Sequence, residues 1–87
     1  MKKVKRPQPL DIEVGRLIRL RRFSLKLSQT DLADRIGVTF QQVQKYEKGV
    51  NRIGASRLQQ IATALEVPVS YFFGDASRRS GKPASEI

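Results

Sequence analysis

Residues 40–48 of the 87-residue chain are rich in amide and ammonium side chains, which can form hydrogen bonds. The stretch FQQVQKYEK holds three glutamines, each of which offers a donor and an acceptor on one planar group. A glutamine can pair with adenine through two hydrogen bonds. These residue types therefore favour recognition of DNA base edges over catalysis.

The alternative is an ordinary helical hairpin whose polar outer face is merely solvated. Glutamine is a poor choice for such a face compared with glutamate or lysine, yet four glutamines lie close together in this part of the chain: Gln29, Gln41, Gln42 and Gln44. We therefore favour base recognition and ask which elements position these side chains.

Residues 28–49 are predicted to form two short helices joined by a tight turn. Ser28 precedes the run QTDLADRI and is expected to cap the first helix, because its hydroxyl can accept from the free amides of the first turn. Ala33 is expected where the helices cross closely, since a larger side chain would push their axes apart. Gly37 follows the last apolar residue, where a left-handed turn costs little only for glycine. The pattern is that of a helix-turn-helix.

The second helix of this pair is expected to begin at Phe40. Thr39 and Gln42 fit a capping box, in which side chains and backbone amides satisfy each other. Val43 and Tyr46 then point inward at three-residue spacing. The residues left for the outer face are Phe40, Gln41, Gln44, Lys45 and Lys48.

At these residues the chain resembles the Xre family, the Cro and phage-repressor-like DNA-binding domains, over about residues 12–73. The matching segments are GRLIRLRR, LSQTDLA, GVTFQQVQKYEKG, NRI and RLQQIATALEVPVSYFF. The resemblance implies an all-α fold, a compact five-helix, lambda-repressor-like domain that contains the helix-turn-helix. It also implies double-stranded DNA as the partner. Arg21 departs from the family pattern, because it falls where the family usually has an apolar residue.

The resemblance further implies that residues 40–47 are the recognition helix, which lies in the major groove. The base-contacting residues would be Phe40, Gln41, Gln42, Gln44 and Lys45, with Phe40 available to a thymine methyl group. The phosphate-contacting residues would be Gln29, Thr39, Lys48, Asn51 and Arg52. Among them, Gln29 matches a position that clamps the phosphate backbone and orders a recognition glutamine.

Composition agrees with a polyanionic partner. Seventeen Lys and Arg against eight Asp and Glu give a formal charge of +9 and a pI near 10.7. The absence of cysteine and histidine excludes disulfides, the usual structural zinc sites and thiol or imidazole catalysis. Asp31 and Asp34 lie one turn apart beside Arg35, which is typical of solvated charges. We therefore expect no enzyme activity, no cofactor and no metal site.

The chain divides into three segments by composition. Residues 1–9 are expected to be a flexible basic arm, residues 10–74 the helix-turn-helix DNA-binding domain, and residues 75–87 a flexible tail. Whether the arm contacts DNA or is solvated stays open. We expect no domain that senses a small molecule. It has neither an apolar run of the roughly 20 residues that cross a bilayer nor a signal-peptide core, so we expect no membrane partner and a cytoplasmic protein, nucleoid-associated when bound to DNA.

The first helix is expected to start near Asp11. Its inward residues would be Val14, Leu17, Ile18 and Leu25, whereas Arg16, Arg19 and Arg21 would be mostly solvated. Arg22 shares the inward face and needs a partner if it is covered. Glu47 matches a family position where a glutamate pairs with an arginine of the first helix, so the resemblance implies a structural ion pair between Arg22 and Glu47. Two separate exposed charges are the alternative.

A fourth helix is expected over about residues 55–66, with Leu58, Ile61, Ala62 and Leu65 as its inward stripe. The loop before this helix is VNRIGAS. Four polar residues in this loop or next to it would place the loop across a phosphate strand: Lys48, Asn51, Arg52 and Arg57. Ordinary surface charge is the alternative.

After Pro68, the run VSYFF predicts a short fifth helix. Tyr71, Phe72 and Phe73 supply more aromatic surface than the edge of a small core needs, so at least one is expected to be exposed in the monomer and to pair two subunits. The resemblance supports a dimer contact here, and a pure core role is the alternative.

These observations favour a sequence-specific transcription regulator that binds a palindromic operator as a homodimer, and the resemblance implies a repressor. The alternative from another class is an antitoxin-like protein that binds both DNA and a protein partner. Non-specific or RNA binding is less favoured, because RNA-binding modules usually display stacking aromatic residues on sheets.

Overall fold

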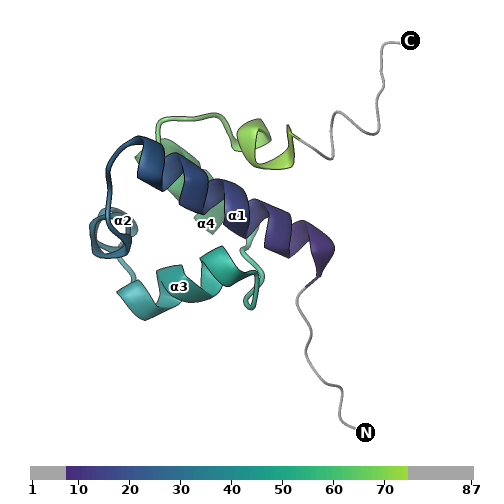
Figure 1. Cartoon of the computed structure of the whole chain (residues 1–87), viewed down its shortest axis with the longest axis horizontal. Coiled ribbons are helices and arrows are strands. Elements are labelled where there is room, and N and C mark those ends of the chain that lie inside the picture. Colours follow the sequence, from purple (N-terminus) through teal and green to yellow (C-terminus); the bar gives the residue numbers. More distant parts are fainter. Residues whose placement is uncertain (1–7, 75–87) are drawn as a thin grey trace, which may run out of the picture.

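The computed structural model describes residues 8–74, where it contains helices and no strand (Figure 1). Its elements are α1 (Pro9–Ser24), α2 (Gln29–Ile36), α3 (Phe40–Lys48), α4 (Ala55–Ala64) and a short 3-10 helix, η1 (Val69–Phe73). The all-α fold class is confirmed, although the fifth helix is a 3-10 helix instead of an α-helix. The expected tail, and the expected arm up to residue 7, lie outside the described residues.

The long helix α1 crosses the middle of the molecule, with α3 on one side of it, α4 behind it and η1 on the other side (Figure 1). It begins at Pro9, two residues earlier than the sequence predicts, because a proline in the first turn lacks only an amide that has no helical partner. A Cβ atom at Gly15 would lie 2.4 Å from the carbonyl oxygen of Tyr46 and 2.6 Å from that of Glu47. The helices α1 and α3 therefore meet backbone to backbone.

Caps fix the helix-turn-helix as the sequence predicts, with one difference. The Ser28 hydroxyl accepts from the Asp31 amide at 2.9 Å, and the Ser28 amide donates to Asp31 Oδ2 at 2.8 Å. Gly37 ends α2 with a φ of 74° in the left-handed region. Thr39 Oγ1 accepts from the Gln42 amide at 3.2 Å, but the return bond from the Thr39 amide to the Gln42 side chain is not formed within residues 8–74. The reciprocal capping box therefore lies at α2 and not at α3.

Three arginines close helix ends by donating to carbonyl groups. Arg21 was expected to be solvated, and this is corrected because its Nε donates to the Leu65 carbonyl at 2.9 Å. Arg57 Nη1 donates to the Ile36 carbonyl at 2.8 Å, where α2 ends, a bond that the sequence does not predict. Arg35 Nη1 donates to the Ala64 carbonyl at 3.2 Å. Basic side chains stabilise helix C-termini in this way, because the last carbonyls lack helical partners.

The core gathers side chains from all five elements. Its largest fully buried members are Ile18, Leu32, Val43, Ile61, Leu65 and Phe72. Phe72 is 0% exposed and belongs to the element that packs on α1 and α4. The expectation that Phe72 joins a subunit interface is therefore wrong, because no part of its side chain is exposed to solvent. Tyr71 and Phe73, on either side of it, are only partly buried.

Candidate nucleic-acid interface

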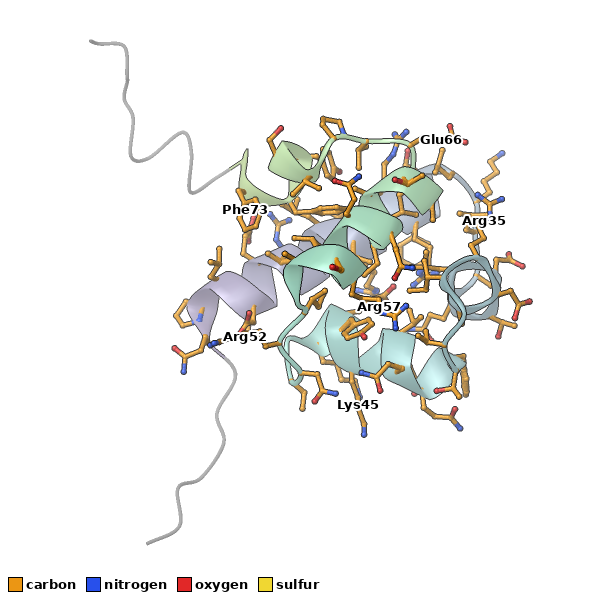
Figure 2. The ribbon with its side chains drawn as sticks, turned by 180° about the vertical axis from the view of Figure 1, so that it is seen from behind. Arg35, Lys45, Arg52, Arg57, Glu66 and Phe73 are labelled. Carbon is orange, nitrogen blue, oxygen red and sulfur yellow. The ribbon has the colours of Figure 1, made fainter. Side chains whose placement is uncertain are left out.

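The helix α3 separates its residues into a buried face and an outer face. Val43, Tyr46 and Glu47 are buried. Gln41, Lys45 and Lys48 are exposed, and Lys45 projects away from the helix and the body of the molecule (Figure 2). Three further residues of α3, namely Phe40, Gln42 and Gln44, are partly buried. Phe40 was expected outside, and the structure corrects this because its ring packs against the core.

A buried ion pair joins the end of α3 to α1. Arg22 Nε donates to Glu47 Oε2 at 2.7 Å, and Arg22 Nη2 donates to Glu47 Oε1 at 3.0 Å. The third arginine nitrogen, Nη1, donates to the Leu27 carbonyl at 2.8 Å. Arg22 is 5% exposed and Glu47 is 9% exposed. The pair that the resemblance implies is thus formed, with the two-point geometry that arginine and carboxylate prefer.

Gln29 contributes to the same joint from the start of α2. Its Nε2 donates to Glu47 Oε1 at 3.1 Å, so this carboxylate oxygen accepts from both Gln29 and Arg22. The resemblance implies that Gln29 contacts a phosphate, and the bond to Glu47 is an additional contact of the same side chain. The bond ties the first residue of α2 to the last turn of α3.

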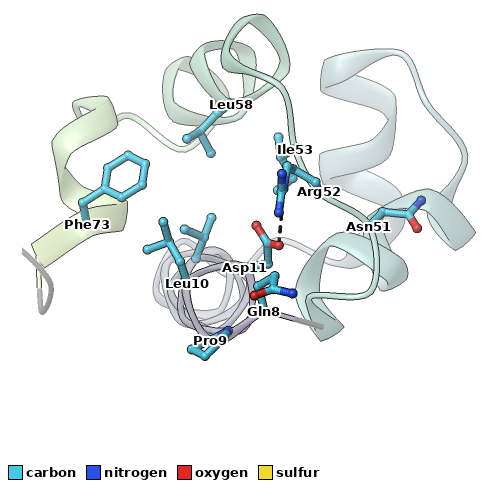
Figure 3. Close-up of a pocket in the computed structure, with 10 residues that line it drawn as sticks. Gln8, Pro9, Leu10, Asp11, Asn51, Arg52, Ile53, Leu58 and Phe73 are labelled. Atoms are coloured by element: carbon cyan, nitrogen blue, oxygen red, sulfur yellow. Dashed lines mark ion pairs between the residues drawn. The ribbon is translucent and has the colours of Figure 1, made fainter. Parts of the chain in front are cut away.

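The loop after α3 is held against the start of α1. Gly49 ends α3 with a φ of 74°, and a Cβ atom there would lie 2.7 Å from the Ile12 Cα. Further along the loop, Arg52 Nε lies 3.6 Å from Asp11 Oδ2, with the Arg52 side chain 75% exposed (Figure 3). Because its side chain is largely exposed, the Arg52 guanidinium is accessible to solvent. An exposed ion pair at this distance contributes little to stability. Lys48 is exposed next to this loop, and Asn51 within it is partly buried.

A pocket of about 490 Å³ opens beside the Asp11–Arg52 pair (Figure 3). Its apolar residues are Pro9, Leu10, Val14, Ile53, Leu58 and Phe73, and its polar residues are Gln8, Asp11, Asn51 and Arg52. This pocket cannot be read from the sequence, because its wall combines residues 8–14, residues 51–58 and Phe73, which lie far apart along the chain. Phe73, expected at a subunit interface, lies on that wall.

A family model for helix-turn-helix proteins, HTH_3, matches residues 17–72, which include all of α2, α3 and α4. The chain belongs to the HTH_3 family. The resemblance to Xre-type proteins is therefore confirmed. Within residues 8–74 of this HTH_3 protein, no helix is long and apolar enough to cross a membrane.

A relative from Rhizobium meliloti (strain 1021), named "Uncharacterized HTH-type transcriptional regulator R00410", is 60% identical over 77 residues. The match covers 88% of this HTH_3 protein and 55% of the relative. The chain therefore spans about half the length of that relative.

Solved structures share the arrangement of helices. The restriction-modification controller protein C.AhdI from Aeromonas hydrophila superimposes with a TM-score of 0.69 at 27% identity, covering 71% of this chain and 94% of that chain. Hydroxypropylphosphonic acid epoxidase from S. wedmorenis superimposes with a TM-score of 0.70 at 23% identity, covering 75% of this chain and 35% of that chain. The second likeness shows the fold alone, since one fold serves unrelated functions.

Proposed function

We propose that this HTH_3 protein is a sequence-specific DNA-binding transcription regulator that represses by occupying a partly palindromic operator as a dimer. The observation that carries the proposal is the division of α3, whose inner residues are buried while Gln41, Lys45 and Lys48 are exposed. An α-helix fits the major groove, where amide and ammonium groups can read base edges. The name of the relative from R. meliloti, an HTH-type transcriptional regulator, supports the same proposal.

Base contacts are assigned to the outer side of α3. Gln41 and Lys45 are exposed and would reach the base edges first. Gln42 and Gln44 are partly exposed and would add contacts on either side of this pair. Phe40 is also partly exposed and would contact a thymine methyl group.

Phosphate contacts are assigned to the two ends of α3 and to the start of α2. Lys48 and Arg52 are exposed cations at the end of α3 and in the loop that follows it, and Asn51 lies between them. Thr39 is exposed where α3 begins. Gln29 would offer a phosphate the part of its amide that does not bond Glu47. Such contacts fix the register of the recognition helix without reading sequence.

The dimer contact is assigned to the partly exposed residues of η1, Tyr71 and Phe73. A two-fold dimer places two copies of α3 on half-sites roughly 34 Å apart, one turn of the DNA helix. The DNA-binding unit of each subunit would be residues 10–74. The antitoxin alternative has no support from the comparisons, which name relatives as transcription regulators.

The test is to select fragments of the source genome with the purified full chain at about 150 mM salt, where phosphate contacts alone bind weakly. We expect the bound fragments to share a two-fold motif, and sedimentation of the complex to give two protein copies for each motif. An even spread of fragments would contradict sequence-specific binding. A motif without two-fold symmetry, bound by one copy, would contradict the dimer.

A further inference from the structure

Phe23 is a large apolar residue in an unusual setting. It is 54% exposed and lies immediately after the buried Arg22 on α1. The guanidinium carbon of Arg22 is 4.7 Å from the centroid of the Phe23 ring, and that of Arg19 is 5.1 Å from it. A guanidinium within about 6 Å of a ring centroid is attracted by the negative face of the ring. The exposed ring therefore has cations as partners.

The Arg22 guanidinium is bonded through each of its nitrogens. Nε and Nη2 donate to Glu47, and Nη1 donates to the Leu27 carbonyl. These hydrogen bonds lie along the edges of the planar group, which leaves its flat faces for stacking, an arrangement that arginine favours with aromatic rings. Water that reached this guanidinium would weaken its attraction to the carboxylate, because a high dielectric constant screens charges.

We propose that Phe23 is a positioning residue that covers the Arg22–Glu47 ion pair, keeps water from it, and so holds α3 at the angle with which it meets DNA. Glu47 also accepts from Gln29, so weakening the ion pair would also weaken the contact that connects α1, α2 and α3. The last step, from the angle of α3 to DNA, rests on the proposed function. The covering of the ion pair is a property of the free protein.

The chain offers matched variants that separate an aromatic cover from an ordinary apolar residue. Phe23→Leu keeps apolar bulk but removes the aromatic face, whereas Phe23→Trp keeps a face that binds cations well. Leu20→Ala is the control on the same helix, because Leu20 is also an exposed apolar residue, at 48%.

The first experiment measures urea unfolding of the full chain. We expect Phe23→Leu to lower the ratio of folded to unfolded protein about 5-fold, which is about 1 kcal/mol, while Phe23→Trp and Leu20→Ala change it less than 2-fold. In an Arg22→Met, Glu47→Leu background there is no pair to cover and only the contact with Arg19 remains, so Phe23→Leu should have a clearly smaller effect than in the wild-type background. An equal loss in both backgrounds would overturn the proposal.

A second measurement serves if the double-variant background does not fold. Hydrogen exchange of the Arg22 Nε–H, followed by NMR, should accelerate about 10-fold in Phe23→Leu and stay unchanged in Leu20→Ala. Unchanged exchange in Phe23→Leu would show that the ring does not exclude water, which would overturn the proposal.

DNA binding tests the last step. A duplex carrying the motif from genomic selection and a random-sequence duplex are titrated with each variant. We expect Phe23→Leu to lower the ratio of the two affinities about 5-fold, with Phe23→Trp and Leu20→Ala unchanged. An unchanged ratio, together with the expected unfolding result, would refute the link from the ion pair to DNA. If no motif is recovered, the proposed function has failed, while unfolding and exchange still decide whether Phe23 covers the pair.

Discussion

The inner and outer sides of α3 differ in how many contacts they make with the rest of the fold. On the inner side, Val43 is fully buried, Glu47 accepts from two side chains, and the α1 backbone at Gly15 approaches within contact distance. On the outer side, Gln41 and Lys45 make no side-chain hydrogen bond or ion pair with any other residue of the range 8–74. The inner side of the helix is therefore packed and bonded within the fold, and the outer side is exposed to solvent.

This difference shows how a small domain can fix the position of an exposed helix face, which under the proposed function is the recognition surface. A contact surface discriminates best when its supporting residues are locked and its outer groups need little reordering on binding. The buried ion pair suits that task better than the task of stabilisation, because the cost of desolvating two charges cancels much of their attraction. We infer that Arg22 and Glu47 mainly set the angle of α3.

Glu47→Ala should break the inner side most severely. The change leaves the buried Arg22 guanidinium without its carboxylate partner. Loss of one partner from a buried pair costs about 3–5 kcal/mol of unfolding free energy. Urea unfolding measures the loss. Lys48→Ala, one residue further along, is the control and should cost less than about 0.5 kcal/mol because Lys48 is exposed. A loss below about 1 kcal/mol in Glu47→Ala would mean that water reaches Arg22 and that the inner side is not closed.

Gly15→Ala should have the next largest effect. The added Cβ would lie within 3 Å of backbone atoms of Tyr46 and Glu47, which cannot rotate away as a side chain would. Overpacking of this kind costs about 1–3 kcal/mol, which offsets the better helix propensity of alanine. Thermal unfolding measures it, with Gly74→Ala as the control because no atom lies within 4 Å of its added Cβ. Equal melting temperatures for the two variants would show that α1 and α3 can separate without loss.

Local signals in the sequence were enough for the helix-turn-helix itself. Ser28, Gly37 and Thr39 act on residues no more than four positions away, so their pattern shows in the sequence. The resemblance to a family supplied what local chemistry could not, the pairing of Arg22 with Glu47 across 25 residues.

The misses share one physical cause, which is that they depend on tertiary packing. Arg21 and Arg57 donate to backbone carbonyl groups of distant residues, and because every residue carries such a group, the sequence does not indicate which one is bonded. The need for glycine at position 15 appears only once α1 and α3 are docked. Likewise, Phe72 and Phe73 are the same residue type in sequence, and only the packing of η1 on α1 and α4 makes Phe72 the buried one.

Acid should reveal a smaller, separate contribution at the start of α2. The Ser28 backbone amide, and then its hydroxyl, lower the pKa of Asp31 by hydrogen bonding to the carboxylate. A carboxylate with a lowered pKa in the folded state adds stability above its unfolded pKa, near 4, and this stability is lost as pH falls through the lower folded value. Asp31→Asn should therefore flatten the fall of the urea midpoint between about pH 5 and pH 2.

Ser28→Ala is the matched variant, because it removes the hydroxyl and keeps the amide. Its acid dependence should lie between those of the wild type and Asp31→Asn. If Asp31→Asn and the wild type lost stability in parallel below pH 4, the cap would not be the source of the lowered pKa. Glu47→Ala should leave the Asp31 dependence unchanged, since the hydrogen bonds between Ser28 and Asp31 do not involve Glu47.

The outer side of α3 should give the smallest effect on folding and a distinct effect on binding. Gln41→Ala and Lys45→Ala should each change the unfolding free energy by less than about 0.5 kcal/mol, because both residues are exposed. Each should nevertheless reduce discrimination between matched and mismatched duplexes by about 1–3 kcal/mol, whereas Lys48→Ala should weaken all duplexes and lower the salt slope by about 1. Titration of both duplexes at several salt concentrations separates these patterns. If Gln41→Ala instead weakened every duplex equally, the outer side would contact phosphates only, and the rigid inner side would serve register and not base choice.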